Sequence, residues 1–402
     1  MVVTLEAMRA AIALTVVAAA LALARQAAAL GACSAADISA QEPACPLSGP
    51  CTIVKQYTVA DGCTLDFSGR DVMLAPSAVL TIGSGTMILV SNDLILAAAP
   101  SSGAYINGRG TGSSAPTNQG GAVVIHASGN VVLQKNGDAR ARIEVSGTSQ
   151  AGYIEIDAGG IVTIAGRLKA DQELHASLAG GGYIDITSAH DIVSLPGSQV
   201  LAGGGSLSRT RGGTIEMDAD GKIDLGAPLN VSGSYGGQVD LTARGDVIVR
   251  GIVANGTASN GDGGYVEIDA GNNVRILDSP IQIDGSDDQN EGGCGGGARI
   301  DSVDGDLTIA ASISGDGRGF GGAGGDLSIN SGRALLLSPG AMVSVHGYGT
   351  DAAECDSGEL NLRAVTTMTL AGKIDASSQV GDAQVGIEAG GNMTISGTVT
   401  VT

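Results

Sequence analysis

Acidic residues recur at fixed positions of an alternating apolar pattern. In five successive units an acidic residue stands between two apolar residues, and in four units an aspartate follows the second apolar residue. The two sets are Glu155, Asp185, Glu216, Asp240 and Glu267, and Asp157, Asp218, Asp269 and Asp301. Carboxylate oxygens are hard ligands that suit Ca²⁺, so these residues are candidate calcium ligands, although the chain has neither an EF-hand nor an RTX repeat. The alternative is a solvated acidic face that keeps a sheet surface soluble.

A second group of polar residues could perform acid/base chemistry. Asp287, Asp288, Asp316 and His346 follow the third apolar segment of three neighbouring units, together with Arg318. Paired carboxylates on neighbouring units could act as general acid and general base on a polysaccharide. The segments are glycine-rich, so polar loop residues without a catalytic role are the alternative. We expect no catalysis.

Three tyrosines, Tyr153, Tyr183 and Tyr265, each precede the first apolar residue of a unit. An exposed column of aromatic rings could stack on sugars. The alternative, which we favour, is that these rings pack on one another at a corner of the fold.

Six cysteines indicate disulfides. Cys33, Cys45, Cys51 and Cys63 form a cluster, and Cys294 and Cys355 lie far from it. No CxxC motif exists and no histidine lies near the cluster, so zinc binding is not expected. An even number of cysteines favours disulfides in an oxidising compartment, with the pairing inside the cluster left open. We expect Cys294 and Cys355 to clamp two long loops, and two free thiols are the alternative.

The N-terminal region is typical of a secretory leader. Residues 10–24 are an uninterrupted apolar run, too short to span a bilayer comfortably, and small residues follow. We expect a signal peptide over residues 1–32 with cleavage near residues 24–32, and therefore a secreted or cell-surface protein. The segment Leu30-Gly31-Ala32-Cys33 is similar to a lipobox, so a lipid anchor at Cys33 is an alternative. No other stretch of the sequence could form a membrane-spanning helix.

Composition and charge disfavour a nucleic-acid-binding protein and a wide globular core. The 402 residues include 65 glycines, no tryptophan and 2% aromatic residues, and the formal net charge is −20. An anionic surface disfavours nucleic acids and favours cations or basic partners. With so few aromatic rings, a thin core of aliphatic side chains is expected instead of a wide globular core.

The glycines accompany a repeat that predicts the fold. The motif Gly-x-h-x-h-x-Ala/Ser, in which h is apolar, recurs at intervals of roughly 29 residues. Its first apolar residues are Val123, Ile154, Ile184, Ile215, Val239, Val266, Ala298, Leu327, Leu360 and Val385. Each unit contains three short strands that could not bury an apolar face alone. The sequence therefore predicts an all-β, single-stranded parallel β-helix of about 10–12 rungs, with right-handed coiling as the common case.

The repeat also predicts the domain organisation. We expect a Cys-rich cap at residues 33–70 and the β-helix at residues 71–402, with clear repeats from residue 120. The step between the first and second strands is nearly constant, whereas the step after the third strand varies, so loops should leave one edge of the stack. The sequence ends after a third strand at Thr402, so we expect either that the sequence is a fragment of a longer chain or that another molecule covers this rung in an end-to-end contact.

Two segments resemble a known family. Gly263-Gly264-Tyr265-Val266-Glu267-Ile268-Asp269-Ala270-Gly271 and Gly358-Glu359-Leu360-Asn361-Leu362-Arg363-Ala364 are similar to the β-helix repeats of filamentous haemagglutinin-type bacterial adhesins. The family's N-terminal secretion domain is not visible. The resemblance implies an exported structural or adhesive surface protein with a glycan or protein partner. The alternatives are a polysaccharide-degrading enzyme similar to pectin-degrading β-helix hydrolases, and a calcium-stapled extracellular scaffold.

Overall fold

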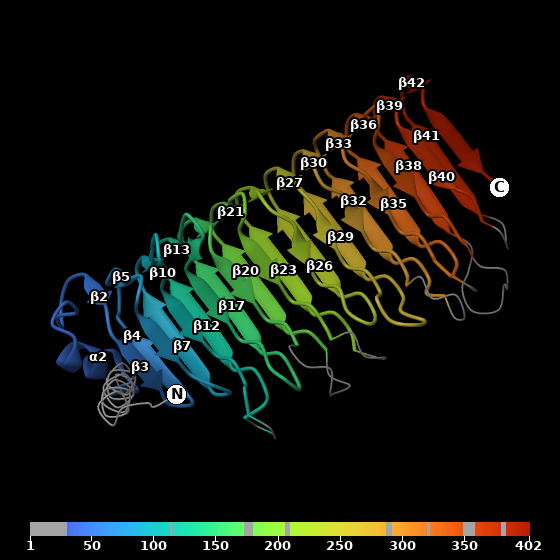
Figure 1. Cartoon of the computed structure of the whole chain (residues 1–402). Coiled ribbons are helices and arrows are strands. Elements are labelled where there is room, and N and C mark those ends of the chain that lie inside the picture. The colour runs from blue at the N-terminus through green and yellow to red at the C-terminus, as the bar shows by residue number, and fades with distance from the viewer. Residues whose placement is uncertain are drawn as a thin grey trace, which may run out of the picture.

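The protein is an elongated stack of short parallel strands, with its described ends far apart (Figure 1). This computed structural model describes residues 30–402 except 113–114, 116, 173–179, 206–209, 287–291, 320–321, 349–357 and 379–382. Three long parallel sheets of twelve, thirteen and fourteen strands run along the stack. The chain visits them in a fixed order, so the predicted parallel β-helix is confirmed, and the twelve-stranded sheet gives twelve rungs.

The twelve-stranded sheet contains the recurring motif, and ten of its strands carry the motif's first apolar residue at their second position. Its strands are β4 (Cys63–Asp66), β7 (Thr86–Ser91), β12 (Ala122–Ala127), β17 (Tyr153–Ala158), β20 (Tyr183–Ser188), β23 (Thr214–Ala219), β26 (Gln238–Ala243), β29 (Tyr265–Ala270), β32 (Gly297–Ser302), β35 (Asp326–Ser331), β38 (Glu359–Ala364) and β41 (Gln384–Ala389).

The thirteen-stranded sheet follows after a tight corner. Its strands are β2 (Cys51–Ile53), β5 (Val72–Leu74), β8 (Leu94–Leu96), β13 (Val131–Leu133), β18 (Val162–Ile164), β21 (Ile192–Ser194), β24 (Ile223–Leu225), β27 (Val247–Val249), β30 (Val274–Ile276), β33 (Leu307–Ile309), β36 (Leu335–Leu337), β39 (Met368–Leu370) and β42 (Met393–Ile395).

The fourteen-stranded sheet completes each rung. Its strands are β1 (Leu30–Ala32), β3 (Gln56–Val59), β6 (Val79–Thr81), β11 (Tyr105–Asn107), β16 (Arg142–Glu144), β19 (Arg167–Lys169), β22 (Gln199–Leu201), β25 (Leu229–Asn230), β28 (Ile252–Val253), β31 (Ile281–Gln282), β34 (Ile313–Ser314), β37 (Met342–Ser344), β40 (Lys373–Ala376) and β43 (Thr398–Val401).

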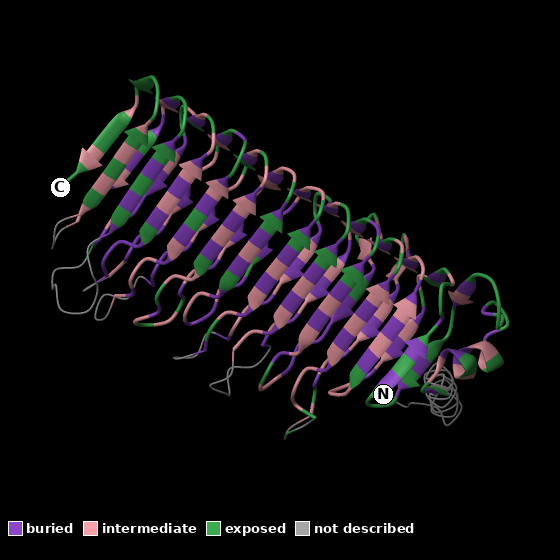
Figure 2. Cartoon of the chain, turned by 180° about the vertical axis from the view of Figure 1, so that it is seen from behind, coloured by how far each residue is buried: buried purple, intermediate pink, exposed green. Residues whose placement is uncertain are grey.

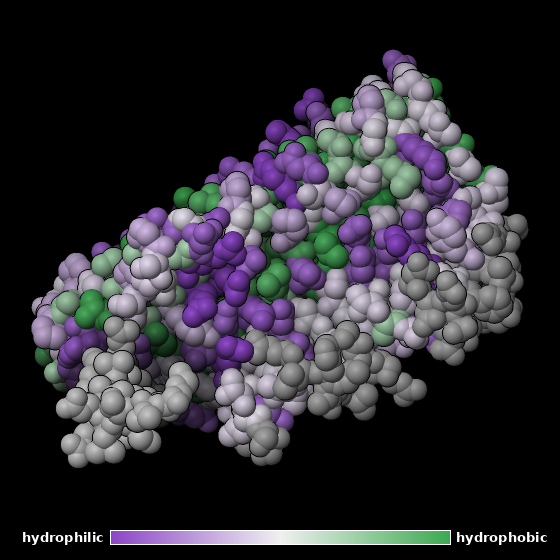
Figure 3. Space-filling model, viewed as in Figure 1, coloured by the Kyte–Doolittle hydropathy of each residue, from purple (hydrophilic) through white to green (hydrophobic). Residues whose placement is uncertain are grey.

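The core is a set of aliphatic columns inside the coil. Successive residues of a strand point to opposite faces, so apolar residues two positions apart both face inward. Ile154 and Ile156 of β17 are fully buried, as are their partners Ile184 and Ile186 of β20. Figure 2 shows this alternation of buried and accessible residues along most strands. Hydrophilic side chains gather over the region of β17 and β20 (Figure 3), because the outward positions of these rungs are polar.

Paired glycines precede seven strands of the twelve-stranded sheet and allow the rungs to stack closely there. A Cβ atom on Gly182 would lie 2.2 Å from the carbonyl oxygen of Gly152, and one on Gly213 would lie 2.0 Å from that of Gly182. Gly212, the first glycine of its pair, is packed as closely, since a Cβ atom on it would lie 1.7 Å from the carbonyl oxygen of Val231. The high glycine content is therefore a packing requirement of the coil.

The Cys-rich segment covers the first rungs with one helix, α2 (Ala35–Gln41). Ser34 caps α2 by accepting a hydrogen bond from the backbone of Asp37, whose carboxylate accepts one in return from the backbone of Ser34. The predicted boundary at residue 71 is displaced, because β2, β3 and β4 within residues 51–66 already belong to the three sheets. These strands lack the glycine motif that identifies later rungs.

Two hairpins interrupt the corner between the thirteen- and fourteen-stranded sheets. They are formed by β9 (Ala98–Ala99) with β10 (Ser102–Gly103), and by β14 (Lys135–Asn136) with β15 (Ala139–Arg140). They correct the expectation that length variation falls on one edge of the stack. In the part of the chain that the structure describes, no helix is long and apolar enough to cross a membrane.

Candidate functional site

The acidic residues form two rows along the twelve-stranded sheet. In the first row Glu155 pairs with Asp185, Asp185 with Glu216, Glu216 with Asp240, and Asp240 with Glu267. These five residues occupy consecutive rungs, so their carboxylates repeat at the strand spacing of about 4.8 Å. We call them the first acidic row. The predicted alignment of this row is confirmed.

The second acidic row comprises Asp157, Asp218, Asp269 and Asp301. Thr187 stands between Asp157 and Asp218, and Thr242 stands between Asp218 and Asp269. Asp269 and Asp301 are direct neighbours. Like charges on adjacent strands repel, so the threonine spacers reduce the repulsion within this row.

Basic residues lie at one end of the first acidic row and beside both end residues of the second. The next outward residue after Glu267 is Arg299, whose guanidinium donates to Glu267 at 2.9 Å and lies 2.6 Å from Asp301. At the opposite end, Nδ1 of His126 lies 3.7 Å from Asp157. Between these ends, the hydrogen bonds of the first acidic row come from neutral groups, namely Tyr153, Tyr183 and Gln238.

The middle of the first acidic row holds a carboxyl group with a displaced pKa. Partial burial, followed by repulsion from Glu216 and Glu155, raises the pKa of Asp185 to about 6. Asp185 therefore carries less than a full charge near pH 6. Burial also raises the pKa of Asp240, and Glu216 and Glu267 add to the effect.

Among the described residues, no three His, Cys, Asp or Glu side chains lie together in a group that could hold a metal ion. Parallel strands place the carboxylates in a line instead of around a point. Asp240 has one carboxylate oxygen, Oδ1, that is shielded from solvent and has no hydrogen-bond partner among the described residues. The calcium hypothesis for the nine acidic residues stays a prediction.

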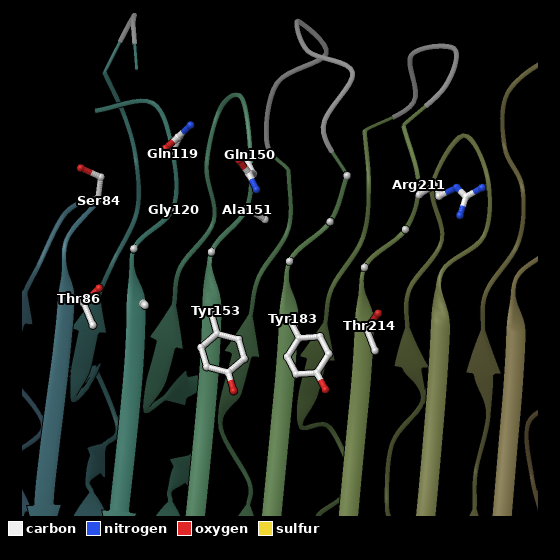
Figure 4. Close-up of a pocket in the computed structure, with 18 residues that line it drawn as sticks. Ser84, Thr86, Gln119, Gly120, Gln150, Ala151, Tyr153, Tyr183, Arg211 and Thr214 are labelled. Atoms are coloured by element: carbon white, nitrogen blue, oxygen red, sulfur yellow. The ribbon is translucent and has the colours of Figure 1, made fainter. Parts of the chain in front are cut away.

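Two of the three tyrosines lie together. The ring centroids of Tyr153 and Tyr183 are 5.4 Å apart and their planes are inclined by 24°. Their hydroxyl groups point along the strands (Figure 4), where Tyr153 donates to Glu155 at 2.8 Å and Tyr183 donates to Glu216. Burial and these carboxylates raise the pKa of both phenols. Tyr265 lies three rungs beyond Tyr183, so it does not join this pair.

A groove follows the glycine pairs beside the tyrosines. It has a volume of about 610 Å³ and crosses consecutive rungs from Ser84 to Thr214. Gln119, Gln150 and Arg211 lie on the loop side of it, and the rings of Tyr153 and Tyr183 lie on the strand side (Figure 4). Its open shape along the stack suits an extended partner.

The proposed catalytic cluster is brought together only in part. Asp316 is almost fully buried, and its Oδ1 accepts hydrogen bonds from the backbone of His346 at 2.9 Å and from the hydroxyl of Ser344 at 2.5 Å. His346 shares a hydrogen bond of 2.5 Å with Ser377. These bonds join neighbouring rungs at a corner. Asp287 and Asp288 lie outside the described residues.

Asp284 belongs to the same corner and is not among the residues singled out from the sequence. Its Oδ1 accepts the backbone N–H of Asp316 at 3.1 Å, and its Oδ2 accepts from Arg318 at 2.8 Å. Its own N–H donates to Asn255 one rung earlier. A polar residue follows the last inward residue of many units, and this signal could have identified the corner.

Disulfides join the Cys-rich segment as predicted. Cys33 pairs with Cys63, and Cys45 pairs with Cys51. The first pair uses the thiol that lipidation at Cys33 would require. Cys294 is also disulfide-bonded, and Cys355 lies outside the described residues.

Comparison of the chain with protein-family models, curated proteins and solved structures finds no match in any of the three. The similarity to filamentous haemagglutinin-type adhesins therefore rests on the repeat residues alone.

Proposed function

We propose that this protein is an exported structural or adhesive surface protein that binds an extended basic partner along the twelve-stranded sheet. The observation that carries the proposal is the first acidic row, with five carboxylates in register on consecutive rungs. A basic partner would relieve the repulsion within the row, and this relief would contribute to binding. The apolar leader and the disulfides support export.

Removal of charge from the row tests this proposal. Asp185→Asn, Glu216→Gln and Asp240→Asn are combined in one variant, and binding to a polylysine-coated sensor is measured against a neutral dextran coating. The control variant combines Asp220→Asn, Asp278→Asn and Asp304→Asn, which removes the same charge from exposed positions outside the row. We expect the row variant to bind several-fold more weakly and the control variant to bind like the unaltered protein.

Equal losses in the two variants would mean that net charge alone drives binding, and unchanged binding in both would remove the row from the interface. Either result would overturn the proposal.

We expect no polysaccharide hydrolysis, because Asp316 and His346 are engaged in corner hydrogen bonds.

A calcium-stapled scaffold is the second candidate, favoured by the shielded and unpartnered Oδ1 of Asp240. It predicts that Ca²⁺ at about 100 times its dissociation constant adds roughly 2.7 kcal/mol to the free energy of unfolding. The measurement is a thermal melt of residues 33–402 with Ca²⁺, with chelator, and with NaCl at equal ionic strength. The gain should disappear when Glu216→Gln and Asp240→Asn are combined, and an unchanged melt would eliminate this candidate.

A further inference from the structure

Arginine side chains meet on the fourteen-stranded sheet, beside the two hairpins. A pocket of about 530 Å³ is lined by Arg140, Arg142 and Arg167, together with Ser101, Ser102 and Gln199. The whole sequence has 21 basic residues against 41 acidic ones. Three arginines around one pocket are therefore a marked local reversal of the protein's charge.

The register of the sheet places two of these arginines in direct opposition. Arg142 of β16 pairs with Arg167 of β19, which in turn pairs with Gln199 of β22. Like charges opposite each other on adjacent strands are destabilising unless another group offsets them. Arg167 is offset by Glu144 at 3.1 Å and is held by Gln199 at 2.6 Å.

The other two arginines have no acidic partner among the described residues. Arg142 lies over the ring of Tyr105 at 4.0 Å, and neither Arg142 nor Arg140 forms an ion pair with any described residue. Nε of Arg140 is shielded from solvent and lacks a hydrogen-bond partner among the described residues. A shielded donor without a partner is costly, so an acceptor supplied by a ligand would be bound favourably.

The hairpins give the pocket a fixed wall. A Cβ atom on Gly103 would lie 2.0 Å from the carbonyl oxygen of Arg140, so the β9–β10 hairpin packs directly on the backbone of the β14–β15 hairpin. This contact holds Arg140 beside Ser101 and Ser102. Asp138 is the acidic residue of the lining, and it is exposed.

We propose that this pocket binds an acidic saccharide through its carboxylate or sulfate group. The planar guanidinium group of arginine, with its fork of N–H donors, matches both oxyanions, because each oxyanion can accept two parallel hydrogen bonds. The serine hydroxyls and the Gln199 amide suit sugar hydroxyl groups, and no large apolar side chain lines the pocket. Its volume lies in the range of pockets for small ligands and exceeds the needs of a bare ion. This site is independent of the acidic rows on the twelve-stranded sheet.

Calorimetric titration of the disulfide-bonded protein tests this proposal. The probes are a galacturonate trisaccharide, a sulfated disaccharide, neutral maltotriose and inorganic sulfate. We expect at least one acidic saccharide to bind and maltotriose not to bind, with the carboxylated and sulfated probes distinguishing the two sources of the oxyanion. Higher ionic strength should weaken binding.

Single variants assign the binding to the pocket. Arg140→Gln and Arg142→Gln should each weaken it about ten-fold or more, because each removes a charged donor. Arg142→Lys should restore little, since an ammonium group lacks the fork. Arg244→Gln, at an exposed arginine that contacts Asp220, is the matched control and should bind normally. Melts of all variants verify folding.

Three results would overturn the proposal. These are binding of neither acidic saccharide, equal binding of maltotriose, and binding that survives both Arg140→Gln and Arg142→Gln. Binding of inorganic sulfate without either acidic saccharide is a case of the first result and indicates an adventitious ion only.

Discussion

At the scale of single residues, carboxylates arranged in a line repel one another and thereby lower the stability of the fold. Carboxylates arranged around a cation do not have this cost. Asp185 lies between Glu155 and Glu216 in register, and partial burial prevents water from screening it fully. The neighbouring phenols donate hydrogen bonds to Glu155 and Glu216, and no hydrogen bond from them reaches Asp185. The row therefore stores repulsion at its centre, which a proton or a basic partner can relieve.

This repulsion predicts a pH dependence of stability. The folded pKa of Asp185 is about 6, whereas that of an aspartate in an unfolded chain is about 3.9. Because the pKa of Asp185 is higher in the folded protein than in the unfolded chain, protonated Asp185 contributes to the free energy of unfolding. This contribution is fully present below about pH 4 and is lost as the pH rises through about 6. Asp185→Asn should therefore raise the free energy of unfolding at pH 7 on the order of 1 kcal/mol, after allowance for solvent screening.

Denaturant melts at pH 4 and pH 7 measure this effect. The gain from Asp185→Asn should vanish at pH 4, and Asp304→Asn, an exposed control, should change stability little at either pH. A variant that is less stable than the unaltered protein at pH 7 would show that Asp185 has a stabilising partner.

At the scale of elements, close approach between rungs requires glycine before most strands of the twelve-stranded sheet. Gly213→Ala would place a methyl group 2.0 Å from the oxygen of Gly182 and 2.7 Å from that of Ala202. Both contacts are backbone atoms and cannot move without disturbing the stack. The cost should be about 2–3 kcal/mol, as in other overpacked sites.

Gly386→Ala is the matched control for this prediction. Its nearest contact is the side-chain oxygen of Asn361, which can rotate away. Thermal unfolding should show a large loss for Gly213→Ala and less than about 1 kcal/mol for Gly386→Ala. Similar melting temperatures for the two variants would contradict the close packing at the glycine pairs.

The repeat predicted these elements and the acidic rows well because register follows from the period. Once Ile154 and Ile184 face inward on successive rungs, Glu155 and Asp185 must be neighbours on the outer face. The arginine pocket could not be predicted in this way. Arg140 reaches it through a hairpin that interrupts the period, and that hairpin carries no signal in the apolar pattern.

At the scale of the whole molecule, the fold spreads function over a long surface. Each rung contacts its neighbours, so each rung is stabilised by the rungs beside it, and rows of equivalent side chains continue along the axis (Figure 1). The acidic rows and the arginine pocket lie on different sheets, and one rigid stack can present both. This arrangement suits a scaffold that holds partners on an external surface.

The proposed surface function requires export, and mass spectrometry of the protein recovered from the outer surface of the producing cells tests for export. We predict a mature N-terminus between residues 24 and 33 and all six cysteines oxidised, with Cys33 joined to Cys63 and Cys45 to Cys51. Recovery of the protein only from the cytosol, with residues 1–29 intact and its thiols reduced, would contradict export.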